Sequence, residues 1–300
     1  MEIHNSLTPV RTKTSVALGY FDGMHLGHRE IIIQAVTHAK RLRLRSTVFT
    51  FDFSKTRPGD KGPGDLFPKK EKFAEMERLG VDLIVEVPFT DIRNLSGREF
   101  ISKVLGHGCL NAAVVCCGED FRFGKGRGSG ADTMERLAGS RGIKVNVVPY
   151  VMDDGIISTT RIKRLVAEGN IQRAAVLLGR PYIIGAYAVK KAIGVGINFS
   201  SVSQKMDESL QLPKYGVYTS RANVNGKWMD SVTYIGTRPS RNGDGIFADT
   251  NIFALNGKTY TDGWVEVELL RMIRQEEKFE SLSALKDAIT ADIQKAKLRR

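Results

Sequence analysis

The order of apolar runs along the first 150 residues constrains the fold more than any other feature of this sequence. Short runs rich in β-branched residues alternate with segments whose apolar residues recur at helical spacing. Strands joined by helices lie parallel, because each helix carries the chain back to the edge where it started. The alternation predicts a doubly wound, mostly parallel α/β sheet. The expected strands are 16–18, 47–53, 82–87, 112–117 and 144–148, and the expected helices are 29–43, 69–79, 97–105 and 133–140.

The pattern changes after residue 182, where short strands separated by turns replace the helices. This spacing is typical of an antiparallel barrel or sandwich. Two helices, from about 159 to 167 and from 171 to 178, precede the change, and a final helix is expected over 283–297. We therefore expect two domains, residues 1–182 and residues 183–300. The strands expected in the second domain are 186–190, 216–224, 227–234, 246–255 and 264–273.

Composition narrows the functional class. No apolar run approaches the roughly 20 residues that span a bilayer, and no signal pattern opens the chain, so a cytoplasmic protein without a membrane partner is expected. The three cysteines lack zinc-site spacing and are expected to be buried, reduced thiols. The net charge of +12 favours an anionic partner. Much of the excess lies in residues 40–45 and in the tail 295–300, where no aromatic-and-basic nucleic-acid motif accompanies it, so a polyphosphate substrate is favoured over nucleic acid.

The turn from Gly19 to His28, GYFDGMHLGH, lies between the first strand and the first helix. Glycines allow a close backbone approach to an anion, and the free N–H groups of a helix start bind it. His25 and His28 are three residues apart, so they share a face if the first turn is helical. The alternative is a strand–helix turn with two surface histidines. The pattern favours a phosphate site.

Two further segments carry candidate residues. The loop 118–130 alternates aromatic and basic residues between glycines, which suits a flat ring and a phosphate, or else a basic surface loop. Ser158-Thr159-Thr160-Arg161 opens a helix, and Arg161 would add a cation for a triphosphate, although the segment taken alone favours a plain N-cap. The loops 19–28, 54–68 and 118–130 all follow strands, so we expect them to converge at the carboxyl edge of the sheet.

Together these segments resemble the bacterial bifunctional riboflavin kinase/FAD synthetases. The resemblance covers most of the chain and includes HLGH (25–28), GEDFRFGKGRG (118–128), ISTTRIKRLVAEGNIQRAAVLLGRPY (157–182) and YIGTRPS (234–240). It implies a Rossmann-like nucleotidyltransferase domain that transfers AMP from Mg-ATP to FMN, giving FAD and pyrophosphate. It also implies a six-stranded barrel that phosphorylates riboflavin with ATP.

The resemblance assigns roles to individual residues. His25, His28 and Arg161 are expected to be catalytic, and Asp120, Phe121, Arg122 and Phe123 to line the flavin side. Mg²⁺ is expected to be held through the ATP phosphates, with no direct protein ligand. Oligomeric state does not follow from the sequence, which is compatible with a homo-oligomer. The expected ATP-binding residues are Gly19, Tyr20, Phe21, Asp22, Gly23, His25, His28, Ser158, Thr159 and Arg161.

Two departures lie in the kinase-like domain. The family's G-F-P-T-A-N segment, which holds Mg-nucleotide, aligns with a stretch containing Gly196, Ile197 and Asn198, where the P-T-A-N tetrad is absent. The family's catalytic Glu, in an E-T-x-I context, aligns with Asp249, which is one methylene shorter. Because a misplacement of about 1 Å can cost on the order of a hundredfold in rate, kinase activity is expected to be weak or absent.

Three alternatives remain open at this point. The first is a fully bifunctional enzyme in which Asp249 still works. The second is a non-catalytic regulator that binds flavin or RNA through its basic surface. The third is adenylyl transfer to another phosphate-bearing acceptor, because the H-x-G-H pattern does not by itself identify the acceptor.

Overall fold

The computed structural model describes residues 1–54, 64–189, 201–237, 245–256 and 258–298. The chain divides into two compact units, the first made of residues 1–63 and 69–158, the second of residues 64–68 and 159–300. The division expected after residue 182 does not coincide with these units, because the two helices that follow residue 158 group with the barrel.

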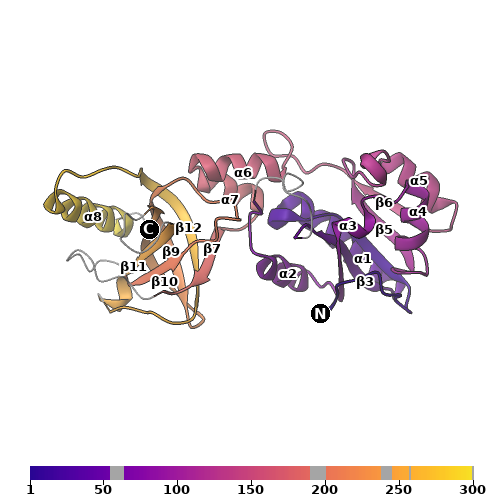
Figure 1. The fold of residues 1–300 in the computed structure, drawn as a ribbon, viewed down its shortest axis with the longest axis horizontal. Helices are drawn as coiled ribbons and strands as arrows, with labels where there is room; N and C mark the ends of the chain where they lie inside the picture. Colours follow the sequence, from indigo (N-terminus) through magenta and orange to yellow (C-terminus); the bar gives the residue numbers. More distant parts are fainter. Residues whose placement is uncertain (55–63, 190–200, 238–244, 257, 299–300) are drawn as a thin grey trace. The chain divides into compact units, whose positions relative to one another are not determined.

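A six-stranded sheet in the order β1-β4-β3-β2-β5-β6 forms the first unit (Figure 1). All its strand pairs are parallel. After β2, the strands β3 and β4 are added on one side of it. The chain then crosses over, and β5 and β6 are added on the other side of β2. Ligands bind beside such a reversal, at the carboxyl ends of the strands. The elements are β1 (Glu2–His4), β2 (Thr14–Leu18), η1 (Asp22–Met24), α1 (Leu26–Leu42), β3 (Arg45–Asp52), α2 (Lys69–Arg78), β4 (Leu83–Pro88), α3 (Phe89–Ile92), α4 (Gly97–Phe100), the π-helix η2 (Ile101–Leu105), β5 (Ala112–Gly118), η3 (Lys125–Arg127), α5 (Ala131–Gly139) and β6 (Lys144–Val148).

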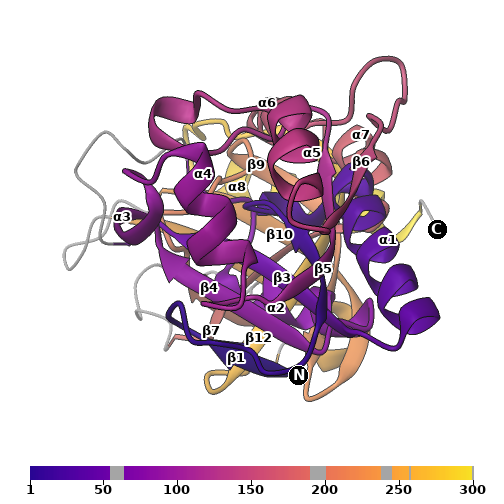
Figure 2. The ribbon, with the colours of Figure 1, turned by 90° about the vertical axis from the view of Figure 1, so that its right-hand side faces the viewer.

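Helices cover both faces of this sheet, with α4 and α5 on one side and α1 on the other (Figure 2). Ile32 of α1 and Phe73 of α2 share an apolar cluster with Ile84 of β4. Phe100 and Met134 belong to the cluster on the opposite face. Strand β2 is buried along its whole length between these layers. The turn that follows β2 therefore begins from a fixed point in the core.

The second unit is built on an antiparallel six-stranded sheet in the order β7-β12-β9-β10-β11-β8, with α8 packed beside it. Its end strands meet through a backbone bridge between Ala188 and Gln204. The Gln204 side-chain amide donates to the carbonyls of Ala186 and Val265 at 2.9 and 2.8 Å, which joins the two ends of the sheet. The elements are α6 (Thr159–Glu168), α7 (Ile171–Leu178), β7 (Tyr182–Tyr187), β8 (Val202–Lys205), β9 (Gly216–Val224), β10 (Lys227–Thr237), β11 (Ile246–Ile252), η4 (Phe253–Leu255), β12 (Trp264–Gln275) and α8 (Leu282–Lys297).

A short segment after β3, residues 64–68, packs within the second unit. Asp65 pairs with Leu210, and the Gln211 N–H donates to the Asp65 carbonyl at 2.8 Å. Leu66 and Phe67 are almost fully buried. The chain thus enters the second unit at residue 64, returns to the first unit at residue 69 and enters the second unit again at residue 159.

The fold class expected from the sequence is confirmed, with differences at particular elements. The helix expected over 29–43 begins at Leu26, because His25 serves as its N-cap. Strands β1 and β8 were missed, because three or four residues carry too little periodicity to be recognised. The strand expected over 246–255 ends at Ile252 and continues as a 3₁₀ turn. The three cysteines are buried and form no disulfide, as expected.

Candidate active site

The turn between β2 and α1 has an irregular backbone. Phe21, Gly23 and Met24 all have positive φ angles, of 57°, 82° and 46°. The Phe21 ring folds back over Gly19, where a Cβ would lie 2.8 Å from the ring, so only glycine fits. Phe21 is 1% exposed and belongs to the core, so it shapes the turn rather than presenting its ring to a ligand. This backbone delivers the next residues to the start of α1.

Two histidines meet at that start. The His25 Nδ1 atom accepts the backbone N–H of His28 at 3.3 Å, which caps the helix. The two imidazole rings stack, with centroids 3.6 Å apart and planes 21° from parallel. Phe21 contacts the His28 ring edge-on at 5.4 Å. The sequence expectation that His25 and His28 lie together is confirmed, although His25 precedes the helix instead of belonging to its first turn.

Burial keeps both histidines neutral in the absence of an anion. It lowers the pKa of His25 to about 4. It also lowers the pKa of His28 well below its usual value, and the charges of His25 and Lys72 add to the effect. The His28 Nδ1 atom is buried without a hydrogen-bond partner among the described residues. A buried polar atom in that state marks a place where a ligand can complete the hydrogen bonding.

The segment before α6 reaches the same helix start. A Cβ on Gly27 would lie 3.2 Å from the His25 ring and 3.8 Å from the Ile157 carbonyl oxygen. Ser158 follows Ile157 directly and is the last residue of the first unit. Thr159 and Arg161 begin α6 in the second unit. A contact of Arg161 with the triphosphate therefore stays a prediction.

The loop 118–130 follows β5 and is tied back on itself. Phe123 and Ser129 exchange two backbone hydrogen bonds of 3.0 Å. Phe123 is 5% exposed within the core, whereas Phe121 is only partly buried and stacks with it at 6.0 Å. Asp120 and Arg122 are exposed or partly exposed at the surface of the loop. Of the four residues expected on the flavin side, Phe123 is the one whose ring is buried in the core.

An aromatic cluster lies at the carboxyl ends of β3 and β4; of its members, the sequence singled out Tyr20, as an ATP-binding residue, but not Phe89. Tyr20 and Phe53 contact edge to face at 4.9 Å, and Phe53 and Phe89 lie 4.8 Å apart with a tilt of 37°. All three rings are partly exposed. The signal was present in TVFTFDF, where the strand ends on an aromatic residue one position beyond β3. We refer to Tyr20, Phe53 and Phe89 as the aromatic cluster.

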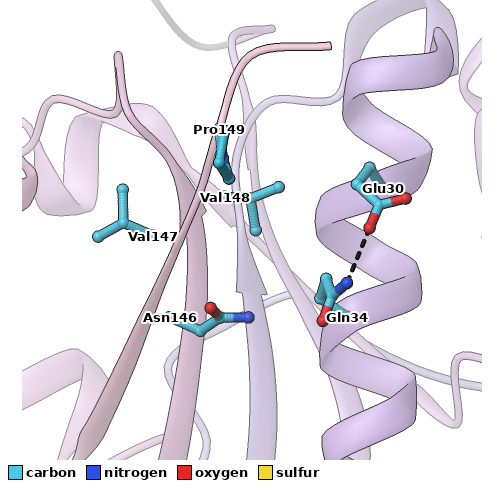
Figure 3. Close-up of a pocket in the computed structure, with 6 residues that line it drawn as sticks. All are labelled: Glu30, Gln34, Asn146, Val147, Val148 and Pro149. Carbon is cyan, nitrogen blue, oxygen red and sulfur yellow. Dashed lines mark hydrogen bonds between the residues drawn. The ribbon is translucent and has the colours of Figure 1, made fainter.

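A cavity of about 300 Å³ lies between α1 and the edge strand β6 (Figure 3). Glu30 and Gln34 line it from α1 and are joined by a hydrogen bond of 2.8 Å. Residues 146–149 line it from β6. The aromatic cluster thus lies at the ends of β3 and β4 beside the turn, whereas the cavity lies at β6, which β5 separates from β2.

Asp249 is the described member of the kinase-like site. It lies half-buried on β11, directly opposite Tyr234 of β10. Its neighbours Ala248 and Thr250 point into the barrel, where Thr250 joins a chain of buried hydroxyls through Thr233 at 2.9 Å. The alternation of a strand puts Asp249 on the outer face. Gly196, Ile197 and Asn198 lie outside the described residues.

None of the helices in the described ranges combines the length and hydropathy that a membrane span requires. Within those ranges, no three histidine, cysteine or carboxylate side chains gather as metal ligands. The prediction that Mg²⁺ is held through ATP phosphates therefore meets no competing protein cluster there, and it stays a prediction.

The parallel sheet, with its histidine pair at a helix start, and the attached six-stranded barrel define a two-module protein of the nucleotidyltransferase class. The FAD synthetase family matches residues 7–161, and the riboflavin kinase family matches residues 178–299. The chain belongs to the bifunctional riboflavin kinase/FMN adenylyltransferase family.

Full-length relatives support this assignment. The Bacillus subtilis bifunctional riboflavin kinase/FMN adenylyltransferase is 31% identical over 98% of this chain and 94% of its own length. The Escherichia coli K12 protein of the same description is 27% identical over 97% and 94%. A crystal structure from Streptococcus pneumoniae, described as a macrolide-efflux protein, matches with a TM-score of 0.86 and 26% identity over 99% of both chains.

Proposed function

We propose that this chain transfers AMP from ATP to FMN, giving FAD and pyrophosphate. The observation that carries the proposal is the stacked His25–His28 pair at the start of α1, in a chain whose first unit matches the FAD synthetase family. An FMN phosphate oxygen attacks the α-phosphorus of ATP and forms a P–O bond. The bond from the α-phosphorus to the bridging oxygen breaks, and the electron pair leaves on pyrophosphate.

The chain's own groups position and neutralise the phosphates. The N–H groups at the start of α1 donate to an anion placed there. A bound polyphosphate raises the histidine pKa values, because an opposite charge favours the protonated form. A protonated His28 Nδ1 atom then donates to the phosphate. Arg161, with Ser158 and Thr159, neutralises charge on the leaving pyrophosphate. Mg²⁺ bound through the ATP phosphates would neutralise further charge.

The substrate rings have two candidate places in the first unit. The aromatic cluster offers partly exposed rings, which suit the isoalloxazine of FMN. The cavity beside β6 offers an amide, a carboxylate and backbone groups, which suit the polar edge of adenine. Asp120, Phe121 and Arg122 extend the flavin surface from the neighbouring loop.

Riboflavin phosphorylation is a second proposed activity. The riboflavin kinase match spans the barrel, and the full-length relatives are described as bifunctional, so the comparisons favour the bifunctional alternative over the expected loss of kinase activity. Asp249 is the carboxylate proposed to accept the riboflavin hydroxyl proton, at a rate that its short side chain reduces.

Chromatography of the products from FMN or riboflavin with Mg-ATP tests both activities. FMN is expected to give FAD, and riboflavin is expected to give slower formation of FMN followed by FAD. Absence of FAD from FMN would overturn the adenylyltransferase proposal. Absence of any product from riboflavin, with FAD formed from FMN, would instead restore the monofunctional expectation.

A further inference from the structure

Helix α2 places a buried lysine against the active-site turn. Lys72 is 6% exposed, and its ammonium nitrogen donates to the Tyr20 carbonyl at 3.4 Å. The same nitrogen lies 4.7 Å from the centroid of the Tyr20 ring and 5.7 Å from that of Phe73. Removing an ammonium group from water is costly unless other groups compensate it, and the Tyr20 carbonyl and ring hold this one against the active-site turn.

The position of Lys72 connects two parts of the site. Its charge contributes to the lowered pKa of His28, so it acts at the histidine pair. Its ring partner Tyr20 also contacts Phe53, so Lys72 lies beside the aromatic cluster. Burial lowers the pKa of both histidines, and the charge of Lys72 is one of the causes of the lowered pKa of His28. Lys72 thus brings positive charge to the place between the histidines and the rings.

We propose that Lys72 binds the phosphate of the incoming FMN and holds it beside the α-phosphate of ATP. The inference rests on the proposed adenylyltransferase function. Two phosphate groups must approach each other for the reaction, and their like charges oppose that approach. A cation on the acceptor side offsets this repulsion, while the helix start and the histidines serve ATP. Lys72 contacts Tyr20 of the aromatic cluster, and its charge also acts on His28, so it lies where the phosphate of a flavin stacked on the cluster would approach the ATP phosphates held by the histidines.

The test is an initial-rate analysis of FAD formation from FMN by the full chain. Lys72→Met is expected to raise the KM for FMN about 10- to 100-fold, the range of a lost charge-assisted hydrogen bond, with little change in the KM for ATP. Lumiflavin, a flavin ring with no phosphate and no hydroxyl to phosphorylate, is the competitor. Its inhibition constant is expected to stay unchanged, because only the phosphate contact is lost.

Two further variants separate the proposed contact from a packing role. Lys72→Arg keeps the charge and is expected to recover most of the affinity for FMN. Lys70→Met, on the exposed side of the same helix, is expected to behave like the unaltered protein. An unchanged KM for FMN in Lys72→Met would overturn the inference, as would a parallel weakening of FMN, ATP and lumiflavin together. Failure of the unaltered protein to form FAD would instead overturn the proposed function.

Discussion

The two candidate sites of this chain are built in different ways. At the turn after β2, positive φ angles at Phe21, Gly23 and Met24 fix where His25 and His28 lie. On β11, Asp249 sits in a regular strand, paired with Tyr234 on one side and Ser203 on the other. The first site depends on an irregular backbone, whereas the second depends on how far one side chain reaches.

This difference determines how each site shows itself in a sequence. An irregular backbone favours special residues, such as Gly23 with its φ of 82°, and these leave a recognisable motif in the sequence. A strand residue leaves no such trace, because any side chain is compatible with the backbone there. The exchange of Glu for Asp at position 249 therefore changes the expected chemistry without changing the fold.

The largest effect is expected from removing an imidazole at the turn. His28→Ala is expected to lower the rate of FAD formation from FMN about 100- to 1000-fold, the cost of losing one preorganised donor. His107→Ala, at an exposed histidine outside the turn, is the matched control and is expected to retain the rate. Near-normal turnover of His28→Ala would remove His28 from the site.

The buried turn is also expected to lose stability in acid. The pKa of His25 is about 4 in the folded chain against an ordinary value of 6.5, so the unfolded state binds more protons between these pH values. Stability then falls as the pH drops from 6.5 to 4, by up to about 3 kcal/mol. Hydrogen exchange of the β2 amides reports this loss.

His25→Asn is the control for the acid effect. Asparagine can still cap α1 but does not titrate, so the exchange of β2 is expected to depend less on pH. An identical pH dependence in both proteins would contradict the assignment to His25.

A smaller effect is expected at the strand site. Asp249→Glu restores the missing methylene and is expected to raise the rate of riboflavin phosphorylation by about 10- to 100-fold. FAD formation from FMN by the same protein serves as the internal control and should not change. A lower kinase rate in Asp249→Glu would show that the barrel is already fitted to aspartate.

Most of the fold follows from the sequence because its strands and helices are long enough to show their period. The exceptions are instructive. Strand β1 has three residues and is defined by its pairing with β4, a contact that no local pattern encodes. Helices α6 and α7 look like the end of the α/β domain in sequence, yet their packing partners place them with the barrel.

The candidate site was predicted in part. The histidine pair was predicted because the glycines beside it and the helix start after it together indicate a phosphate site. The resemblance places Phe123 on the flavin side, but its ring is buried in the core, so a flavin contact of Phe123 stays a prediction. Lys72 and Phe89 were missed because each lies on an ordinary element, and only the tertiary fold brings them to the turn.

The excursion of residues 64–68 has a consequence for dissecting the protein. Leu66 and Phe67 are 2% and 4% exposed, and Tyr182, Arg180 and Gln211 of the second unit contact this segment. A fragment that stops at Ser158 would carry these two side chains without the residues that shield them. The modules are therefore interlaced along the chain, and no single cut yields an intact copy of either one.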